Sequence, residues 1–150
     1  MSVSNNLAAI LSELSANRAA LDDESLAGLV EEVLAAGHVF LAGAGRSGIA
    51  SEGFANRLLH LGKSVSLVGE ITAPHSRAGD LLIIGSGSGA TSSLVALARK
   101  AQAAGVRIAL LTTDPASEIG QLANVVVTLP GASKSDAGAR ASIQPMGSAF

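Results

Sequence analysis

The sequence predicts an α/β protein, a doubly wound three-layer α/β/α sandwich built on a five-stranded parallel sheet. Five short and almost continuously apolar runs recur along the chain, and most of them are separated by segments with a helical spacing of apolar residues. Strands without polar alternation are typical of a parallel sheet that helices cover on both faces. The 150 residues are enough for one domain of this kind, and we expect residues 1–150 to form it.

The first two elements are expected to be helices, within about residues 5–36. The first has the spacing i, i+3, i+4, i+7 of one apolar helix face, at Leu7, Ile10, Leu11 and Leu14. The second repeats this pattern between Leu26 and Leu34. It follows Asp22 and Asp23, which belong to a residue type that commonly begins helices.

Strands and helices alternate through the rest of the chain. The expected strands are His38–Gly43, Ser64–Val68, Leu81–Gly85, Val106–Thr112 and Asn124–Leu129. The expected helices are Ile49–Leu61, Thr91–Ala104 and a short one near Ser117–Leu122. Small and polar residues predict an exposed loop over Gly131–Ile143, with a lid over a ligand as the alternative, and Gln144–Phe150 resembles the start of another helix.

Composition excludes several classes of function. The net charge of −2 and the three aromatic residues, all Phe, give no support to nucleic-acid binding. The sequence has no Cys for a disulfide framework or a thiolate metal site, and no apolar run near the ~20 residues that span a bilayer. The N-terminus lacks the pattern of a secretory signal, so we expect a soluble cytoplasmic protein with no membrane partner.

Two glycine-rich turns follow expected strands, "GAGRSG" over Gly43–Gly48 and "SGSGAT" over Ser86–Thr91. Ligands of open parallel sheets bind beyond the carboxyl ends of the strands, where successive connections diverge. Glycine permits close approach of the backbone, and a helix that starts there offers free N–H groups and a positive dipole end. The clustered hydroxyls of Ser86, Ser88 and Thr91 suit the oxygens of a phosphate monoester. Ordinary helix capping by Ser88 is the alternative, and it accounts for only one hydroxyl.

The first turn also satisfies the G-x-G-x-x-G pattern of dinucleotide-binding folds, and Glu70 follows Gly48 at the spacing of a ribose-binding carboxylate. Arg46 argues against this alternative, because it places a cation in a turn that usually relies on backbone alone. The chain also leaves no room for a separate substrate domain. A P-loop is excluded, because no G-K-[S/T] follows either turn.

Several segments together resemble the sugar isomerase (SIS) domain family, and within it the 6-phospho-3-hexuloisomerases of the ribulose monophosphate pathway. They are "GAGRSG", "FANRLLHLG", "VGEITAP", "DLLIIGSGSGAT", "LLTTDPASEIGQLANVVVTLPG" and "SIQPMGSAF", and the resemblance runs from about His38 to Phe150. It implies an intramolecular oxidoreductase, a ketose–ketose isomerase that interconverts D-arabino-hex-3-ulose 6-phosphate and fructose 6-phosphate in formaldehyde assimilation. It implies no metal or organic cofactor, and a homotetramer with active sites between subunits.

The resemblance also implies roles for individual residues. Ser47, Ser86, Ser88 and Thr91, with Gly87 in the second turn, would hold the phosphate. Gly45 and Arg46 would line the sugar site and Gln144 would flank it. His60 would come from an adjacent subunit, because it lies about 18 Å along its helix from Gly48.

The general base is the least defined part of the expected site. In the family the motif "MGSxF" precedes a glutamate regarded as the catalytic base, and nothing follows Phe150, so we expect the sequence to be an incomplete part of a longer protein. The titratable candidates near the site are Glu52, Glu70, His60 and His75. Of these we assign His60 to catalysis, in ring opening or proton shuttling, and Glu70 to a substrate-side or structural role.

Two further interpretations stay open. The protein could be a phosphosugar-binding module without chemistry, although no helix-turn-helix segment or basic patch precedes the domain. It could also isomerise another sugar phosphate, because a phosphate site recognises the common group and says little about the other hydroxyls.

Overall fold

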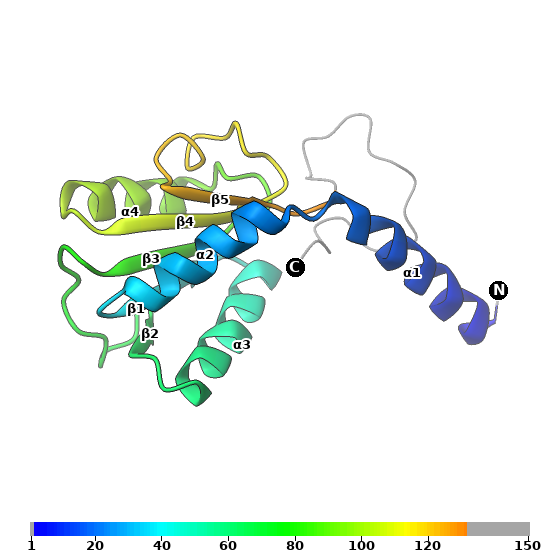
Figure 1. The fold of residues 1–150 in the computed structure, drawn as a ribbon, viewed down its shortest axis with the longest axis horizontal. Coiled ribbons are helices and arrows are strands. Elements are labelled where there is room, and N and C mark those ends of the chain that lie inside the picture. The colour runs from blue at the N-terminus through cyan, green and yellow to red at the C-terminus, as the bar shows by residue number, and fades with distance from the viewer. Residues whose placement is uncertain (1, 132–150) are drawn as a thin grey trace.

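The computed structural model describes residues 2–131, and within them the predicted α/β architecture is confirmed. All five strands lie parallel in one sheet, in the order β2-β1-β3-β4-β5 (Figure 1). Their bounds are β1 Val39–Gly43, β2 Val65–Leu67, β3 Leu81–Gly85, β4 Arg107–Thr112 and β5 Val125–Thr128. The strand order changes direction between β1 and β3, which is where open α/β sheets bind their ligands.

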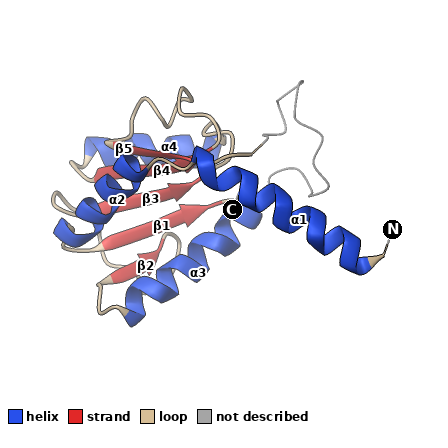
Figure 2. Cartoon of the chain, turned by 45° about the vertical axis from the view of Figure 1, so that its right-hand side comes forward, coloured by secondary structure: helices blue, strands red, loops and turns tan. Residues whose placement is uncertain are grey.

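Helices cover both faces of the sheet (Figure 2). On one face, α2 (Asp23–Ala35) packs against β5, and α3 (Arg46–His60) packs against β1 and β2. On the opposite face, α4 (Ser92–Ala103) packs against β3 and β4. The chain therefore leaves β1 toward one face and β3 toward the other.

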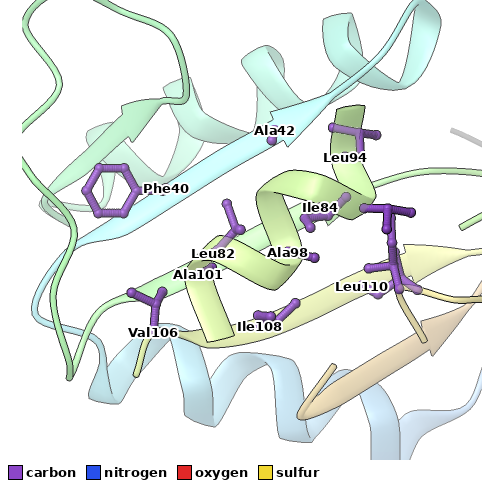
Figure 3. Packing of buried hydrophobic residues seen from close by; sticks show 12 residues of the cluster. Phe40, Ala42, Leu82, Ile84, Leu94, Ala98, Ala101, Val106, Ile108 and Leu110 are labelled. Atoms are coloured by element: carbon purple, nitrogen blue, oxygen red, sulfur yellow. The ribbon is translucent and has the colours of Figure 1, made fainter. Parts of the chain in front are cut away.

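The core consists of two apolar layers, one on each side of the sheet. Alternate strand residues point to opposite faces, so successive residues of one strand contribute to different layers. The layer under α4 is shown in Figure 3 and includes Phe40, Leu82, Ile84, Leu94, Ala98, Ile108 and Leu110. The layer under α2 and α3 includes Leu29, Val33, Val39, Leu41, Leu58, Leu81, Ile83 and Val127. Small alanines of α4, such as Ala98, bring this helix close to the sheet.

The first helix, α1 (Val3–Asn17), extends away from the sheet and buries none of its residues (Figure 1). Its predicted apolar face is present, but Leu7, Leu11 and Leu14 are each more than half exposed. A short 3₁₀ turn, η1 (Arg18–Ala20), connects it to the second helix. An isolated helix of this length gains little stability from its own hydrogen bonds, and within residues 2–131 its apolar face is left uncovered.

The second helix has a capping residue at its start and an ion pair to β4 along its length. The carboxylate of Asp22 accepts a hydrogen bond from the backbone N–H of Ser25, as expected of a capping residue, and this bond lowers the pKa of Asp22. Arg107, the first residue of β4, makes a two-point ion pair with Glu32, and this pair raises the pKa of Arg107. The ion pair links α2 to the start of β4.

Two predicted elements differ in the structure. The third helix begins at Arg46 rather than Ile49, so half of the first glycine turn is helical. The short helix expected near Ser117–Leu122 is instead a series of turns. Gly120 has low helix propensity, and it lies so close to the Pro115 carbonyl that a Cβ atom there would be 2.2 Å from its oxygen.

Most of the expected loop over Gly131–Ile143, and all of the expected helix start over Gln144–Phe150, lie outside the described residues. Within residues 2–131, none of the helices is long and apolar enough to span a lipid bilayer.

Candidate functional site

The two glycine-rich turns lie next to each other at the carboxyl edge of the sheet. β1 and β3 are hydrogen-bonded neighbours, and their last residues, Gly43 and Gly85, pair in register. One turn follows each strand and leads into α3 or α4 on opposite faces. The prediction that both turns border one site is therefore consistent with the topology.

In the first turn, the start of α3 comes very close to the end of β1. A Cβ atom on Gly43 would lie 2.8 Å from the backbone nitrogen of Gly48, so only glycine allows this approach. Gly45 precedes α3 with φ of +57°, the left-handed region that favours glycine. Arg46 and Ser47 then form the first helical positions, at which backbone N–H groups lack helical acceptors.

In the second turn, one hydroxyl is buried without a partner. Ser86 is only 4% exposed, and its Oγ has no hydrogen-bond partner among the described residues. Buried polar groups are nearly always hydrogen-bonded, and an unsatisfied one costs about 1–3 kcal/mol. The neighbouring Ser88 is partly satisfied, because its Oγ accepts a hydrogen bond from the Ala90 N–H within the turn. Ser86 therefore has an unused donor and acceptor at the site.

The helices that begin at the site differ in capping from those that begin elsewhere. Away from the site, Ser2 caps α1 and Asp22 caps α2 through side-chain hydrogen bonds. At the site, Gly45 before α3 and Thr91 before α4 make no side-chain capping bond. The alternative that Ser88 caps α4 is therefore wrong. The first N–H groups of α4 remain available to an anion, which their positive dipole end favours.

The second turn is held against the loop between β4 and β5. Gly89 has φ of +56°, and a Cβ atom there would lie 1.9 Å from Ser117 Oγ. The carbonyl of Gly89 accepts a hydrogen bond from the Ile119 N–H, and the Ser86 N–H donates to the carbonyl of Leu111. These contacts hold the backbone of the second turn against β4 and the loop that follows it.

The structure brings together seven of the predicted site residues on the two turns. They are Gly45, Arg46, Ser47, Ser86, Gly87, Ser88 and Thr91. His60 is the last residue of α3, so it lies at the opposite end of that helix from Gly45, and it is exposed. At 1.5 Å per residue the separation is about 20 Å, too far for His60 to act at the turns of its own chain. Gln144 lies outside the described residues.

The other titratable candidates lie in different surroundings. The carboxylate of Glu70 accepts a hydrogen bond from the Leu67 N–H and so closes the turn after β2, which supports the structural role. His38 bonds Ser64 and Ser66 through its two ring nitrogens and thus joins β1 to the edge strand. Within residues 2–131, no three His, Asp or Glu side chains lie close enough together to hold a metal ion.

His75 lies beside a cavity of about 200 Å³ on the α4 face of the sheet. Its lining includes Phe40, Leu82 and Lys100, and it contains no residue of either glycine turn. The cavity is thus separate from the candidate phosphate site, and its apolar walls offer few hydrogen bonds to a sugar.

Sequence reasoning did not identify the residues that support the second turn from β4. Thr112 and Thr113 both contact the Gly87 carbonyl through their hydroxyls. The sequence does contain a signal for these two threonines, because "TTDPAS" places a second cluster of hydroxyl residues at the end of β4, the strand next to β3.

Known proteins resemble this chain in sequence and in fold. The sequence pattern of the SIS domain family matches residues 32–150, which is most of the chain and includes both turns. The chain belongs to the SIS domain family. Its SIS region therefore begins within α2 and contains the whole described sheet.

Relatives of this SIS domain carry one recurring name. A 3-hexulose-6-phosphate isomerase from Mycobacterium gastri is 44% identical over 99% of this chain and 74% of its own length. A protein of the same name from Bacillus subtilis is 42% identical over 100% of this chain and 82% of its own length. The solved structure of a hypothetical Methanococcus jannaschii protein, for which a function as 3-hexulose-6-phosphate isomerase was inferred, superposes with a TM-score of 0.73 at 33% identity. That match covers 99% of this chain and 77% of the other.

Proposed function

We propose that this protein is a 3-hexulose-6-phosphate isomerase, which is the activity that the resemblance to 6-phospho-3-hexuloisomerases implies. It interconverts D-arabino-hex-3-ulose 6-phosphate and fructose 6-phosphate. Relatives of that name align over essentially the whole chain at 42–44% identity, which supports the proposal. The structural observation that supports it most directly is the buried hydroxyl of Ser86 at the carboxyl end of β3. This hydroxyl has no hydrogen-bond partner among the described residues.

A phosphate monoester satisfies what this site lacks. Its oxygens accept hydrogen bonds from the Ser86 hydroxyl and from the N–H groups of Ser92 and Ser93 at the start of α4, for which residues 2–131 provide no acceptor. The dipole of α4 adds a favourable interaction with the dianion. In this proposal Ser47, Gly87, Ser88 and Thr91 complete the phosphate site.

The sugar lies beyond the phosphate in this proposal. Gly45 and Arg46 line it, and Gln144 flanks it. The reaction moves the carbonyl from C3 to C2 by removing the proton on C2 and adding one at C3, through an enediol. A positive side chain or backbone N–H groups at the first turn stabilise negative charge on the enediolate oxygen. The enzyme acts in the ribulose monophosphate pathway of formaldehyde assimilation, in the cytoplasm.

We further propose that residues 1–150 form one SIS domain and that four copies assemble with active sites between subunits. The exposed apolar face of α1 supports assembly, because Leu7, Leu11 and Leu14 lie on a helix that has no buried residue in the described part of the chain. The position of His60 supports shared sites. It is too far from its own turns to act there, so it serves as a catalytic residue of a neighbouring subunit.

Replacing Ser86 by alanine is expected to raise KM for fructose 6-phosphate about 10- to 100-fold, the effect of losing one hydrogen bond to a charged group. The melting temperature should stay the same or rise, because the removed hydroxyl has no partner among residues 2–131. Steady-state kinetics and thermal unfolding measure the two quantities. Ser12→Ala, an exposed serine of α1, is the control. A Ser86→Ala protein with unchanged KM would contradict the assignment.

The reaction itself is tested with hexulose phosphate made in situ from formaldehyde and ribulose 5-phosphate. We expect the purified full-length protein to convert it to fructose 6-phosphate, detected by a coupled dehydrogenase, and calorimetry to show binding of fructose 6-phosphate but not of fructose. Binding without turnover would support a phosphosugar-binding module instead. Turnover of a different sugar phosphate only would leave the phosphate site intact and exclude this substrate.

A further inference from the structure

The carbonyl oxygen of Gly87 accepts three hydrogen bonds, all from two consecutive residues at the end of β4. The Thr112 hydroxyl donates to it over 2.9 Å, the Thr113 hydroxyl over 2.8 Å and the Thr113 N–H over 3.0 Å. A backbone carbonyl has two lone pairs, and one or two bonds satisfy it. Folding alone therefore does not require both hydroxyls.

The surroundings of Thr112 orient its hydroxyl proton toward the Gly87 carbonyl. Thr112 is completely buried, and its Oγ accepts a hydrogen bond from the Asp114 N–H. That bond occupies a lone pair and leaves the hydroxyl proton to donate, and Gly87 O is nearer than the other acceptor, the Asp114 carbonyl at 3.3 Å. The β-branched side chains of both threonines restrict χ1, so the hydroxyls hold their positions at little further entropic cost.

Fixing this carbonyl also fixes the N–H group on the other side of the same peptide. The bond between Gly87 and Ser88 is trans and planar, so the Gly87 C=O and the Ser88 N–H point in opposite directions. The carbonyl points toward β4, on one side of β3. The Ser88 N–H therefore points away from β4, and β1 with the first glycine turn after it lies on the other side of β3 from β4. Within residues 2–131 this N–H has no acceptor.

We propose that Thr112 and Thr113 are positioning residues of the phosphate site. They hold the Gly87–Ser88 peptide so that the Ser88 N–H faces the space between the two turns and donates to a phosphate oxygen. Neither threonine touches the ligand. The inference rests on the proposed function, because it presumes that a phosphate binds between the turns.

The test uses Thr113, because removal of its hydroxyl leaves Gly87 O with two hydrogen bonds and the fold intact. Thr113→Val is expected to raise KM for fructose 6-phosphate and the Kd of inorganic phosphate about 3- to 10-fold, with kcat changed less than about 2-fold. Thr113→Ser keeps the hydroxyl and should recover most of the affinity. Thr128→Val, an exposed threonine paired with Thr112 in the β4–β5 register, is the control and should behave as the unmodified protein.

Each outcome separates the two proposals. If the unmodified protein binds fructose 6-phosphate and Thr113→Val binds it equally well, the positioning role is wrong and the proposed function stands. Equal losses in Thr113→Val and Thr113→Ser, in parallel with melting temperature, would also overturn the positioning role in favour of simple packing. If the unmodified protein binds neither fructose 6-phosphate nor inorganic phosphate, both proposals fail.

Discussion

Replacing His60 by alanine is expected to lower kcat at least about 100-fold while changing KM only a few-fold. General acid–base groups typically contribute about 10²- to 10⁴-fold to a rate, and they act on the transition state more than on the bound substrate. Initial rates over a range of hexulose phosphate concentrations separate the two constants. His75→Ala is the matched control, because His75 is also exposed and lies outside both turns. An unchanged kcat in His60→Ala would exclude His60 from catalysis.

Mixing variants tests from which subunit His60 acts. Each α3 places His60 about 20 Å from the turns of its own chain, so a working site needs the turns of one subunit and His60 of another. Co-assembly of His60→Ala with Ser86→Ala should therefore restore activity at low substrate, because some sites combine an intact turn with an intact histidine. Activity equal to the average of the two parents would show that both residues serve the same chain.

Replacing Gly89 by alanine is expected to destabilise the protein by about 2–5 kcal/mol. The left-handed backbone costs a residue with a Cβ atom about 1–2 kcal/mol, and overpacking adds about 1–3 kcal/mol, because the new atom would lie 1.9 Å from Ser117 Oγ. For a domain of this size the melting temperature should fall by about 5–15 °C. Affinity for fructose 6-phosphate should fall as well, because the second turn has to move away from Ser117.

Two further variants separate the cost of the left-handed backbone at Gly89 from the cost of the close contact with Ser117. Gly62 has φ of +80° and no atom near its Cβ position, so Gly62→Ala should show the backbone cost alone. Adding Ser117→Gly to Gly89→Ala removes the clashing side chain and should recover part of the lost stability. If Gly89→Ala is no more destabilising than Gly62→Ala, the close contact between the second turn and the β4–β5 loop is not the constraint described here.

The sheet and the two turns could be predicted from the sequence because their signals are local. Continuous apolar runs such as Leu81–Gly85 indicate buried strands, and glycine with serine directly after a strand indicates a turn at the carboxyl edge. The start of α3 was misplaced because Gly45 and Gly48 have low helix propensity, whereas the close approach of Gly48 to Gly43 depends on tertiary packing.

Other features depend on contacts between residues far apart in the sequence. The hydrogen bonds from Thr112 and Thr113 to Gly87 span 25 and 26 residues, and no periodicity predicts them. The apolar stripe of α1 was visible in the spacing of Leu7, Leu11 and Leu14, but spacing cannot show that the chain leaves it uncovered. The missing hydrogen bond of Ser86 likewise becomes evident only when its surroundings are known.

A crystal structure of the protein with fructose 6-phosphate tests the central claim most directly. We expect the phosphate group to lie between the two glycine turns, with oxygens within hydrogen-bond distance of Ser86 Oγ and the Ser88 N–H. A structure in which the sugar phosphate is bound elsewhere, and Ser86 keeps its hydroxyl unpartnered, would contradict it.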